Sequence, residues 1–373
     1  MKRIVSAIKN GFEEKALSLL KDIDSDLSIK NARKLFEMSI DLNSARVFEW
    51  LITCSINRFE LRNIDWQYTF KYASKKGLSE IVKTLLLHER VDPSHKNNRA
   101  FGLASGKGNL EVVKILLSDK RITPCVADNY KIHHVNGTGF YEVIKLMLLD
   151  KRFDPSVSFN FIFRNVCKYG NAEIIKLLLA NKRVDPSAFN NYSIEVACES
   201  GHLEIVKLLL SDERVNPGVN INYPISCASQ NGHLEIVKIL LQDKRVDPTS
   251  NYNSPIRLAS FHGKLEVARL LLLDERVNPS DNGDYAIRNA SQNGYLEIVK
   301  LLLQDKRVDP SADRNYAINL AIRNGHLEIV KLLLQDKRVD PKSNCNNAIH
   351  LANNLGRSEI VKLLEDAGCK LNL

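Results

Sequence analysis

The chain has no long run of apolar residues, and this absence argues against a membrane-spanning helix. Such a helix needs roughly 18 consecutive apolar residues, whereas here they come in short groups such as Leu208–Leu210. The opening residues, Met1–Ser6, also have no apolar signal-peptide core. These absences predict a protein inside the cell, in the cytoplasm and without membrane contact.

Motifs for binding metals or cofactors are missing as well. The seven cysteines show no Cys-x-x-Cys spacing, so no zinc site is indicated. His133 and His134 are adjacent and would point different ways on a helix, which favours a structural interpretation. Gly102–Lys107 has some features of a phosphate-binding loop, but Gly108 stands where that loop requires a hydroxyl residue. The sequence predicts no cofactor, no metal and no catalytic residue.

No linker, charge run or low-complexity tract interrupts the chain. Instead, glycine recurs every 31 residues, and proline keeps the same interval. A constant period of this kind is typical of a repeat protein, which usually works as a recognition surface rather than as an enzyme. The glycines are Gly77, Gly108, Gly139, Gly170, Gly201, Gly232, Gly263, Gly294, Gly325 and Gly356.

Residues 311–341 show what one repeat encodes. Apolar residues recur at helical spacing between Ile318 and Ile322, and a second set with the same spacing lies between Leu327 and Leu334. Gly325 between the two sets suits a tight turn, because glycine accepts a positive φ at little cost. Each repeat is therefore predicted to be a pair of helices joined by a turn.

A short polar residue precedes the first helix of each repeat, such as Asn191 or Asn315. In this position a side-chain oxygen can accept hydrogen bonds from the N–H groups at a helix start. We therefore predict a series of helix caps, each worth about 1 kcal/mol. The same position holds Asn98, Asn129, Asn160, Asn222, Asn253, Asp284 and Asn346.

The segment Gly-His-Leu-Glu-Ile-Val-Lys-Leu-Leu-Leu occurs at residues 201–210 and again at 325–334, and it resembles the ankyrin repeat. The family's Thr-Pro-Leu-His segment is replaced here by residues such as Tyr316–Asn319. The resemblance implies an all-α ankyrin-repeat solenoid of about twelve helix-turn-helix repeats with short fingers. It also implies a non-enzymatic scaffold that binds a partner protein on its concave face and acts as a monomer.

We expect one solenoid over residues 1–373. Diverged repeats are expected over residues 1–65, regular repeats over 66–341 and a capping repeat over 342–373. Short, asparagine-rich repeats of this style also resemble those of amoebae and their giant DNA viruses. For a viral protein, that resemblance implies the cytoplasm of the host.

Two charged series recur along the repeats. A glutamate three residues before a lysine, as in Glu80 and Lys83, predicts ion pairs along the helix surface. Arginines such as Arg245 are closely followed by an acid or amide, here Asp247, so we predict internal pairing rather than phosphate binding. General acid–base catalysis is not expected from a carboxylate that recurs in the same surroundings.

Binding residues are expected where the repeats differ from one another. In the ankyrin family the finger and the exposed end of the first helix form the recognition face. Aromatic and arginine side chains are the usual anchors of protein interfaces, so we interpret two sets as partner-binding. The alternative is that residues such as Phe261 merely pack on their neighbours. The first set is Tyr252, Arg257, Phe261 and His262, and the second is Phe159, Arg164 and Tyr169.

The formal net charge of +9 is moderate for this length and is partly local. Several cations at matching positions of neighbouring repeats indicate an acidic partner or nucleic acid, which is the alternative function. The patch shows no interleaved aromatic pattern and no nucleic-acid fold signature, so solvated surface charge is the default interpretation. An enzyme is the third and least favoured reading. The cations are Lys71, Lys75, Lys76, Lys96, Arg99 and Lys107.

Overall fold

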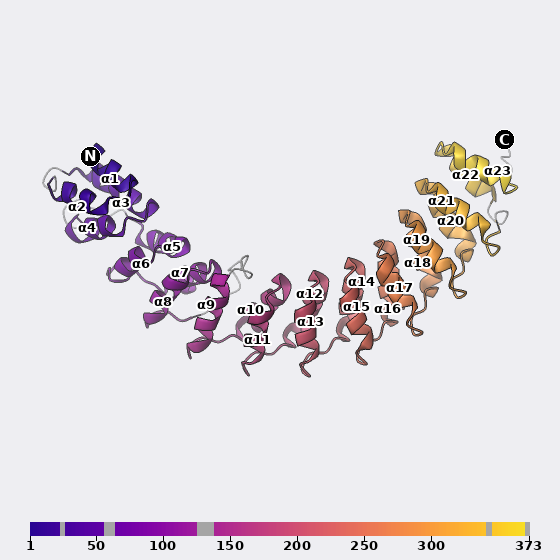
Figure 1. Cartoon of the computed structure of the whole chain (residues 1–373), viewed down its shortest axis with the longest axis horizontal. Coiled ribbons are helices and arrows are strands. Elements are labelled where there is room, and N and C mark those ends of the chain that lie inside the picture. The colour runs from indigo at the N-terminus through magenta and orange to yellow at the C-terminus, as the bar shows by residue number, and fades with distance from the viewer. Residues whose placement is uncertain (23–26, 56–63, 125–137, 341–344, 370–373) are drawn as a thin grey trace. The chain divides into compact units, whose positions relative to one another are not determined.

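Helices make up all the regular secondary structure in the residues that the computed structural model describes, and no strand occurs among them. The helices form antiparallel pairs, and each pair corresponds to one repeat (Figure 1). For α9 (Thr138–Leu149), the preceding half of the repeat lies outside the described residues. The structure describes residues 1–22, 27–55, 64–124, 138–340 and 345–369.

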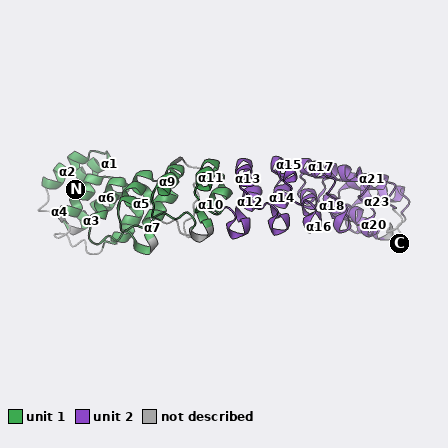
Figure 2. Cartoon of the chain, turned by 90° about the horizontal axis from the view of Figure 1, so that it is seen from below, with its two compact units in different colours: residues 1–185 green, residues 186–373 purple. Residues whose placement is uncertain are grey.

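The chain falls into two compact units, residues 1–185 and 186–373 (Figure 2). The helices of unit 1, besides α9, are α1 (Lys2–Lys9), α2 (Glu13–Asp22), α3 (Ile29–Asp41), α4 (Ala45–Ser55), α5 (Trp66–Lys76), α6 (Ser79–Leu86), α7 (His95–Gly106), α8 (Leu110–Ser118), α10 (Val157–Tyr169) and α11 (Ala172–Leu179). Those of unit 2 are α12 (Ala188–Ser200), α13 (Leu203–Leu210), α14 (Val219–Asn231), α15 (Leu234–Gln242), α16 (Ser250–Phe261), α17 (Leu265–Leu272), α18 (Asp281–Asn293), α19 (Leu296–Leu303), α20 (Ala312–Asn324), α21 (Leu327–Gln335), α22 (Cys345–Asn354) and α23 (Ser358–Asp366).

Two layers of helices build unit 2. The first helices of successive repeats, α12, α14, α16, α18 and α20, pack side by side, and the second helices form the other layer (Figure 1). Between the layers lie the apolar residues of each repeat, such as Ile329, Val330 and Leu333. Complete burial of one such side chain stabilises the fold by about 1.5–3 kcal/mol. The predicted all-α solenoid of helix pairs is confirmed.

Glycine makes the turn within most repeats, as predicted. Gly325, for example, ends α20 at a φ of 79°, a left-handed conformation that costs glycine little. Gly139 is different, because it lies inside α9. A Cβ atom on Gly139 would lie 2.6 Å from the carbonyl oxygen of Gly108, so this glycine permits close backbone contact instead.

The prediction that the asparagine series caps the first helices is wrong. Asn191 itself has a φ of 56°, whereas a capping residue usually has an extended backbone. Its Oδ1 accepts a hydrogen bond from the N–H of Asn216, 2.7 Å away in the finger that ends the same repeat. Equivalent bonds join Asn98 to Thr123, Asn160 to Asp185, Asn222 to Asp247, Asn253 to Asn278, and Asp284 to Asp309. The series therefore joins the start of each repeat to the finger at its end.

Five repeats of unit 2 begin with three consecutive residues in the left-handed region. The bounds of α12, α14, α16, α18 and α20 include these turns, which precede the right-handed part of each helix. An L-residue other than glycine pays about 1–2 kcal/mol for this conformation, and asparagine and aspartate tolerate it best. The turns are residues 189–191, 220–222, 251–253, 282–284 and 313–315.

The arginine series also pairs internally, as predicted, but with a different partner. Arg245 binds Asp243, two residues before it, at 2.6 Å, and not Asp247. It also donates to the carbonyl oxygens of Val215 and Leu210 in the preceding repeat, at 2.8 and 3.2 Å. The hydrogen bond from Arg245 lowers the pKa of the Asp243 carboxyl. Each such arginine therefore joins two repeats.

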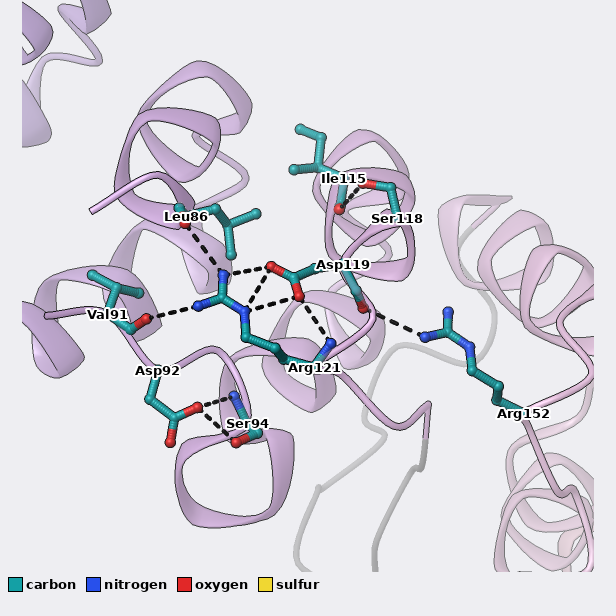
Figure 3. Close-up of polar contacts among 9 residues, drawn as sticks. All are labelled: Leu86, Val91, Asp92, Ser94, Ile115, Ser118, Asp119, Arg121 and Arg152. Atoms are coloured by element: carbon teal, nitrogen blue, oxygen red, sulfur yellow. Dashed lines mark hydrogen bonds and ion pairs between the residues drawn. The ribbon is translucent and has the colours of Figure 1, made fainter. Parts of the chain in front are cut away.

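Figure 3 shows the same arrangement in unit 1. Arg121 binds Asp119 and donates to the carbonyl oxygens of Leu86 and Val91, at 3.2 and 3.4 Å. The predicted ion pairs at three-residue spacing are confirmed, and they lie on the exposed face of the second helices. Among these pairs are Glu80–Lys83, Glu111–Lys114, Glu173–Lys176, Glu204–Lys207, Glu297–Lys300 and Glu328–Lys331.

Candidate partner-binding surfaces

The left-handed turns of unit 2 carry large apolar side chains that are open to solvent. Phe189 in α12 is 57% exposed, Ile221 in α14 is 66% exposed and Tyr252 in α16 is 66% exposed. Each residue has a positive φ between 55° and 57°. For isoleucine, which branches at Cβ, this backbone conformation is a marked outlier. Solvation and backbone sterics therefore both oppose these residues.

Arg257 lies against the left-handed turn of its own repeat. Its Nε donates to the carbonyl oxygen of Tyr252 at 2.6 Å, and its Nη2 donates to that of Asn251 at 2.8 Å. Its guanidinium also lies 5.2 Å from the ring centroid of Tyr285 in α18. The structure thus brings together two members of the first predicted set, Tyr252 and Arg257.

Tyr285 begins a short series of alternating rings and guanidinium groups. Arg288 lies 5.6 Å from the Tyr285 ring and 5.1 Å from the Tyr316 ring of the next repeat. Arg288 also forms an ion pair with Asp313 at 3.3 Å. Sequence reasoning missed Tyr285, Arg288 and Tyr316. The signal that could have found them is a tyrosine at the start of the first helix with an arginine three residues later.

Phe261 and His262 form a separate pair at the other end of α16. Their rings meet edge to face with centroids 4.9 Å apart, and Phe261 is 38% exposed. Because Tyr252 lies at the start of α16, the first predicted set forms two contact pairs rather than one cluster. Arg257 lies between the two pairs along α16, one helical turn before Phe261.

The second predicted set lies in α10 of unit 1. Tyr169 is half-buried, and the ammonium group of Lys168 lies 5.9 Å from its ring. Arg164 is half-buried as well. The side chain of Phe159 lies outside the described residues. These residues stay a predicted binding set.

Glu195, Tyr223 and Cys227 bring titratable groups together on α12 and α14. Burial raises the pKa of Glu195, whose carboxylate accepts a hydrogen bond from Asn220. A hydrogen bond to Cys227 raises the pKa of Tyr223 to about 12, and burial raises that of Cys227 to about 11. The thiol therefore stays protonated at neutral pH, so it lacks the reactivity of a catalytic cysteine.

The predicted basic patch lies in unit 1, on α5 and α7. Its side chains are exposed or half-buried at the helix surfaces. The prediction that no aromatic residues interleave with the cations is wrong. Tyr68 and Tyr72 of α5 stack on each other, and lysines of the patch contact both rings. The patch comprises Lys71, Lys75, Lys76, Lys96, Arg99 and Lys107.

Two further observations concern the described residues. They contain no group of three or more His, Cys, Asp or Glu side chains placed to hold a metal ion, while His133 and His134 lie outside them. Within the same ranges, no helix combines the length and apolar character that crossing a bilayer demands.

Comparison with known families gives one match. The profile of a family described as "Ankyrin repeats (3 copies)" matches residues 132–222, 196–283 and 285–373, which together exceed half of the chain. A search of curated proteins found no match.

Proposed function

Because the chain belongs to the ankyrin repeat family and is a protein–protein interaction module, we propose that unit 2 binds a partner protein through its fingers and first helices. In this family these elements form the concave face. The chain acts as a scaffold and does not catalyse a reaction on its partner. The repetition supports a non-catalytic role, because equivalent polar residues have the same surroundings in every repeat. Catalysis instead needs one residue in a special environment.

The exposed side chains of the left-handed turns carry this proposal. Phe189, Ile221 and Tyr252 come from three consecutive repeats whose first helices pack side by side. Residues held in a disfavoured backbone conformation concentrate at functional sites. Large apolar side chains on otherwise polar turns are the groups that a partner would bury.

Arg257 and Phe261 extend this surface toward the other end of α16. The two hydrogen bonds of Arg257 to backbone carbonyls fix its side chain before a partner arrives. A fixed side chain loses less conformational entropy on binding, so each contact contributes more affinity. Tyr285 and Tyr316, held by Arg257 and Arg288, continue the same surface across α18 and α20.

Affinity capture from the cell of origin tests the proposal. The double substitution Tyr252→Ala and Phe261→Ala should abolish capture, because each lost anchor commonly costs about 2 kcal/mol. Leu273→Ala is the matched control, since Leu273 is 78% exposed but lies beyond the second helix α17. Equal loss in both variants, or normal capture by the double variant, would contradict the proposal.

The alternative function, binding of nucleic acid, rests on the cations of the basic patch. The same capture, repeated with nuclease and at two salt concentrations, separates the two functions. A partner that is lost on nuclease treatment and not on substitution of Tyr252 would favour nucleic acid.

A further inference from the structure

Unit 1 concentrates positive charge on two neighbouring first helices that contain no acidic residue. Neither α5 nor α7 holds an aspartate or glutamate, and the two helices pack against each other. Together with the residue that follows α7 they present six cations, which we call the basic strip. Its members are Lys71, Lys75, Lys76, Lys96, Arg99 and Lys107.

Aromatic rings hold two of these lysines in place. The Nζ of Lys71 lies 4.8 Å from the ring centroid of Tyr68, and that of Lys76 lies 5.6 Å from the ring of Tyr72. The two rings stack with centroids 6.2 Å apart. Such contacts restrict the lysine side chains, so that less entropy is lost when an anion binds them.

A hollow of about 120 Å³ opens between the starts of α5 and α7. The cations Lys71, Lys96 and Arg99 line it together with Tyr68, which is 54% exposed. Three cations around one hollow of this size suit a carboxylate-bearing side chain, because their charges converge on the group that enters.

Two carboxylates of the protein also line the hollow, but both already accept hydrogen bonds from the chain. Asp65 accepts from the N–H of Tyr68 at 2.8 Å. Asp92 accepts from the N–H and the hydroxyl of Ser94, at 2.9 and 2.6 Å, and these bonds lower its pKa. Both carboxylates stay charged, and the three cations that line the hollow outnumber them, so a small excess of positive charge remains.

We propose that the basic strip binds an acidic segment of a polypeptide in extended conformation. This surface differs from the aromatic turns of unit 2, so the inference goes beyond the function proposed above. α5 contains 11 residues and is about 16 Å long, which an extended chain spans with about five residues. Nucleic acid is less favoured, because a base needs an open ring face and Tyr68 already contacts Lys71 and Tyr72.

Fluorescence anisotropy with the full chain tests this site. The probes are a labelled ten-residue peptide of alternating glutamate and serine, the same peptide with glutamine for glutamate, and a ten-nucleotide oligothymidine. One variant carries Lys75→Gln, Lys76→Gln and Arg99→Gln. The matched control carries Lys83→Gln, Lys114→Gln and Lys176→Gln, which remove equal charge from second helices of unit 1.

The glutamate peptide should bind more tightly than the glutamine peptide. The strip variant should bind the glutamate peptide about tenfold more weakly than the unmodified chain. The control should change this affinity by less than about twofold, because only charges that contact the peptide contribute strongly. If both variants weakened binding of the glutamate peptide equally, net charge alone would explain the effect and the proposal would be overturned. Absence of any binding of the glutamate peptide would overturn it as well. If oligothymidine bound more tightly than the glutamate peptide, the strip would be a nucleic-acid site instead. Tyr252→Ala should leave the peptide affinity unchanged, so this test and that of unit 2 fail independently.

Discussion

The side-chain oxygen of Asn222 accepts a hydrogen bond from the backbone N–H of Asp247, 2.8 Å away in the finger that ends the same repeat. The amide of Asn222 also donates to the hydroxyl of Ser250 at 2.8 Å. One buried side chain therefore fixes the finger at the end of its own repeat and joins it to the start of the following repeat. In an array whose repeats contact only their neighbours, such bonds set the interface energy between repeats.

Asn222→Ala should destabilise unit 2 by about 2 kcal/mol, because it removes this bond and places alanine in the left-handed region. Asn222→Gly should cost less, since glycine keeps the backbone conformation and only the hydrogen bonds are lost. Denaturant unfolding measures both. If alanine and glycine cost the same free energy, the left-handed conformation contributes no strain at this position.

Arg245→Gln should destabilise the chain by about 1–3 kcal/mol, because charge-assisted bonds to Asp243 and to two carbonyl groups are lost together. The matched control is Lys244→Gln at the exposed neighbouring position, which should change the stability by less than about 0.5 kcal/mol. Thermal unfolding compares the two variants. A larger effect at Lys244 would show that net charge, rather than the connection between repeats, sets the stability.

Sequence periodicity predicted the helix pairs because apolar spacing and glycine turns are local properties. It predicted internal pairing of Arg245 but chose Asp247 over Asp243, since the choice depends on which carboxylate the finger turns toward the guanidinium. The capping role of Asn191 was wrong for a similar reason. A left-handed backbone, which no residue spacing reveals, directs its side chain to the finger at the end of the repeat.

The candidate sites were predictable only where one repeat carried the whole signal. Tyr252 and Arg257 belong to the same repeat, and the structure brings them together. The series through Tyr285, Arg288 and Tyr316 crosses repeats, so its members look unremarkable one repeat at a time. Contacts between repeats depend on helix stacking, which the sequence specifies only through the sum of many packing interactions.

Asp284 should make the stability of unit 2 depend on pH. It occupies the position of Asn222 and Asn253, and burial raises its pKa from 3.8 to about 6. The folded state then binds the proton more tightly than the unfolded state. The contribution of this group is therefore fully favourable below about pH 4 and is lost as the pH rises toward about 6, by an amount on the order of 2 kcal/mol.

Asp284→Asn should remove this dependence, which urea unfolding between pH 4 and pH 7 measures as the difference from the unmodified chain. The new amide would lie near Ala312, where the equivalent of Ser250 is missing, so adding Ala312→Ser should raise the stability further at pH 7. Asn222→Asp is the reciprocal control and should introduce a similar pH dependence. An unchanged slope in Asp284→Asn would show that Asp284 is not the titrating group.

Ile221 gives the sharpest test of whether the left-handed turns serve binding rather than folding. Its side chain is 66% exposed and its φ is 57°, so Ile221→Asn should relieve strain and raise the stability by about 1 kcal/mol. The same substitution should weaken binding of the partner captured by unit 2, because it removes an apolar contact. Gly283→Ile, at the equivalent position two repeats on, is the reciprocal control and should destabilise the chain by about 1–2 kcal/mol. Unfolding and binding measured on the same preparations decide the matter: a stabilised Ile221→Asn variant with undiminished affinity would mean that the strained turns have no part in recognition.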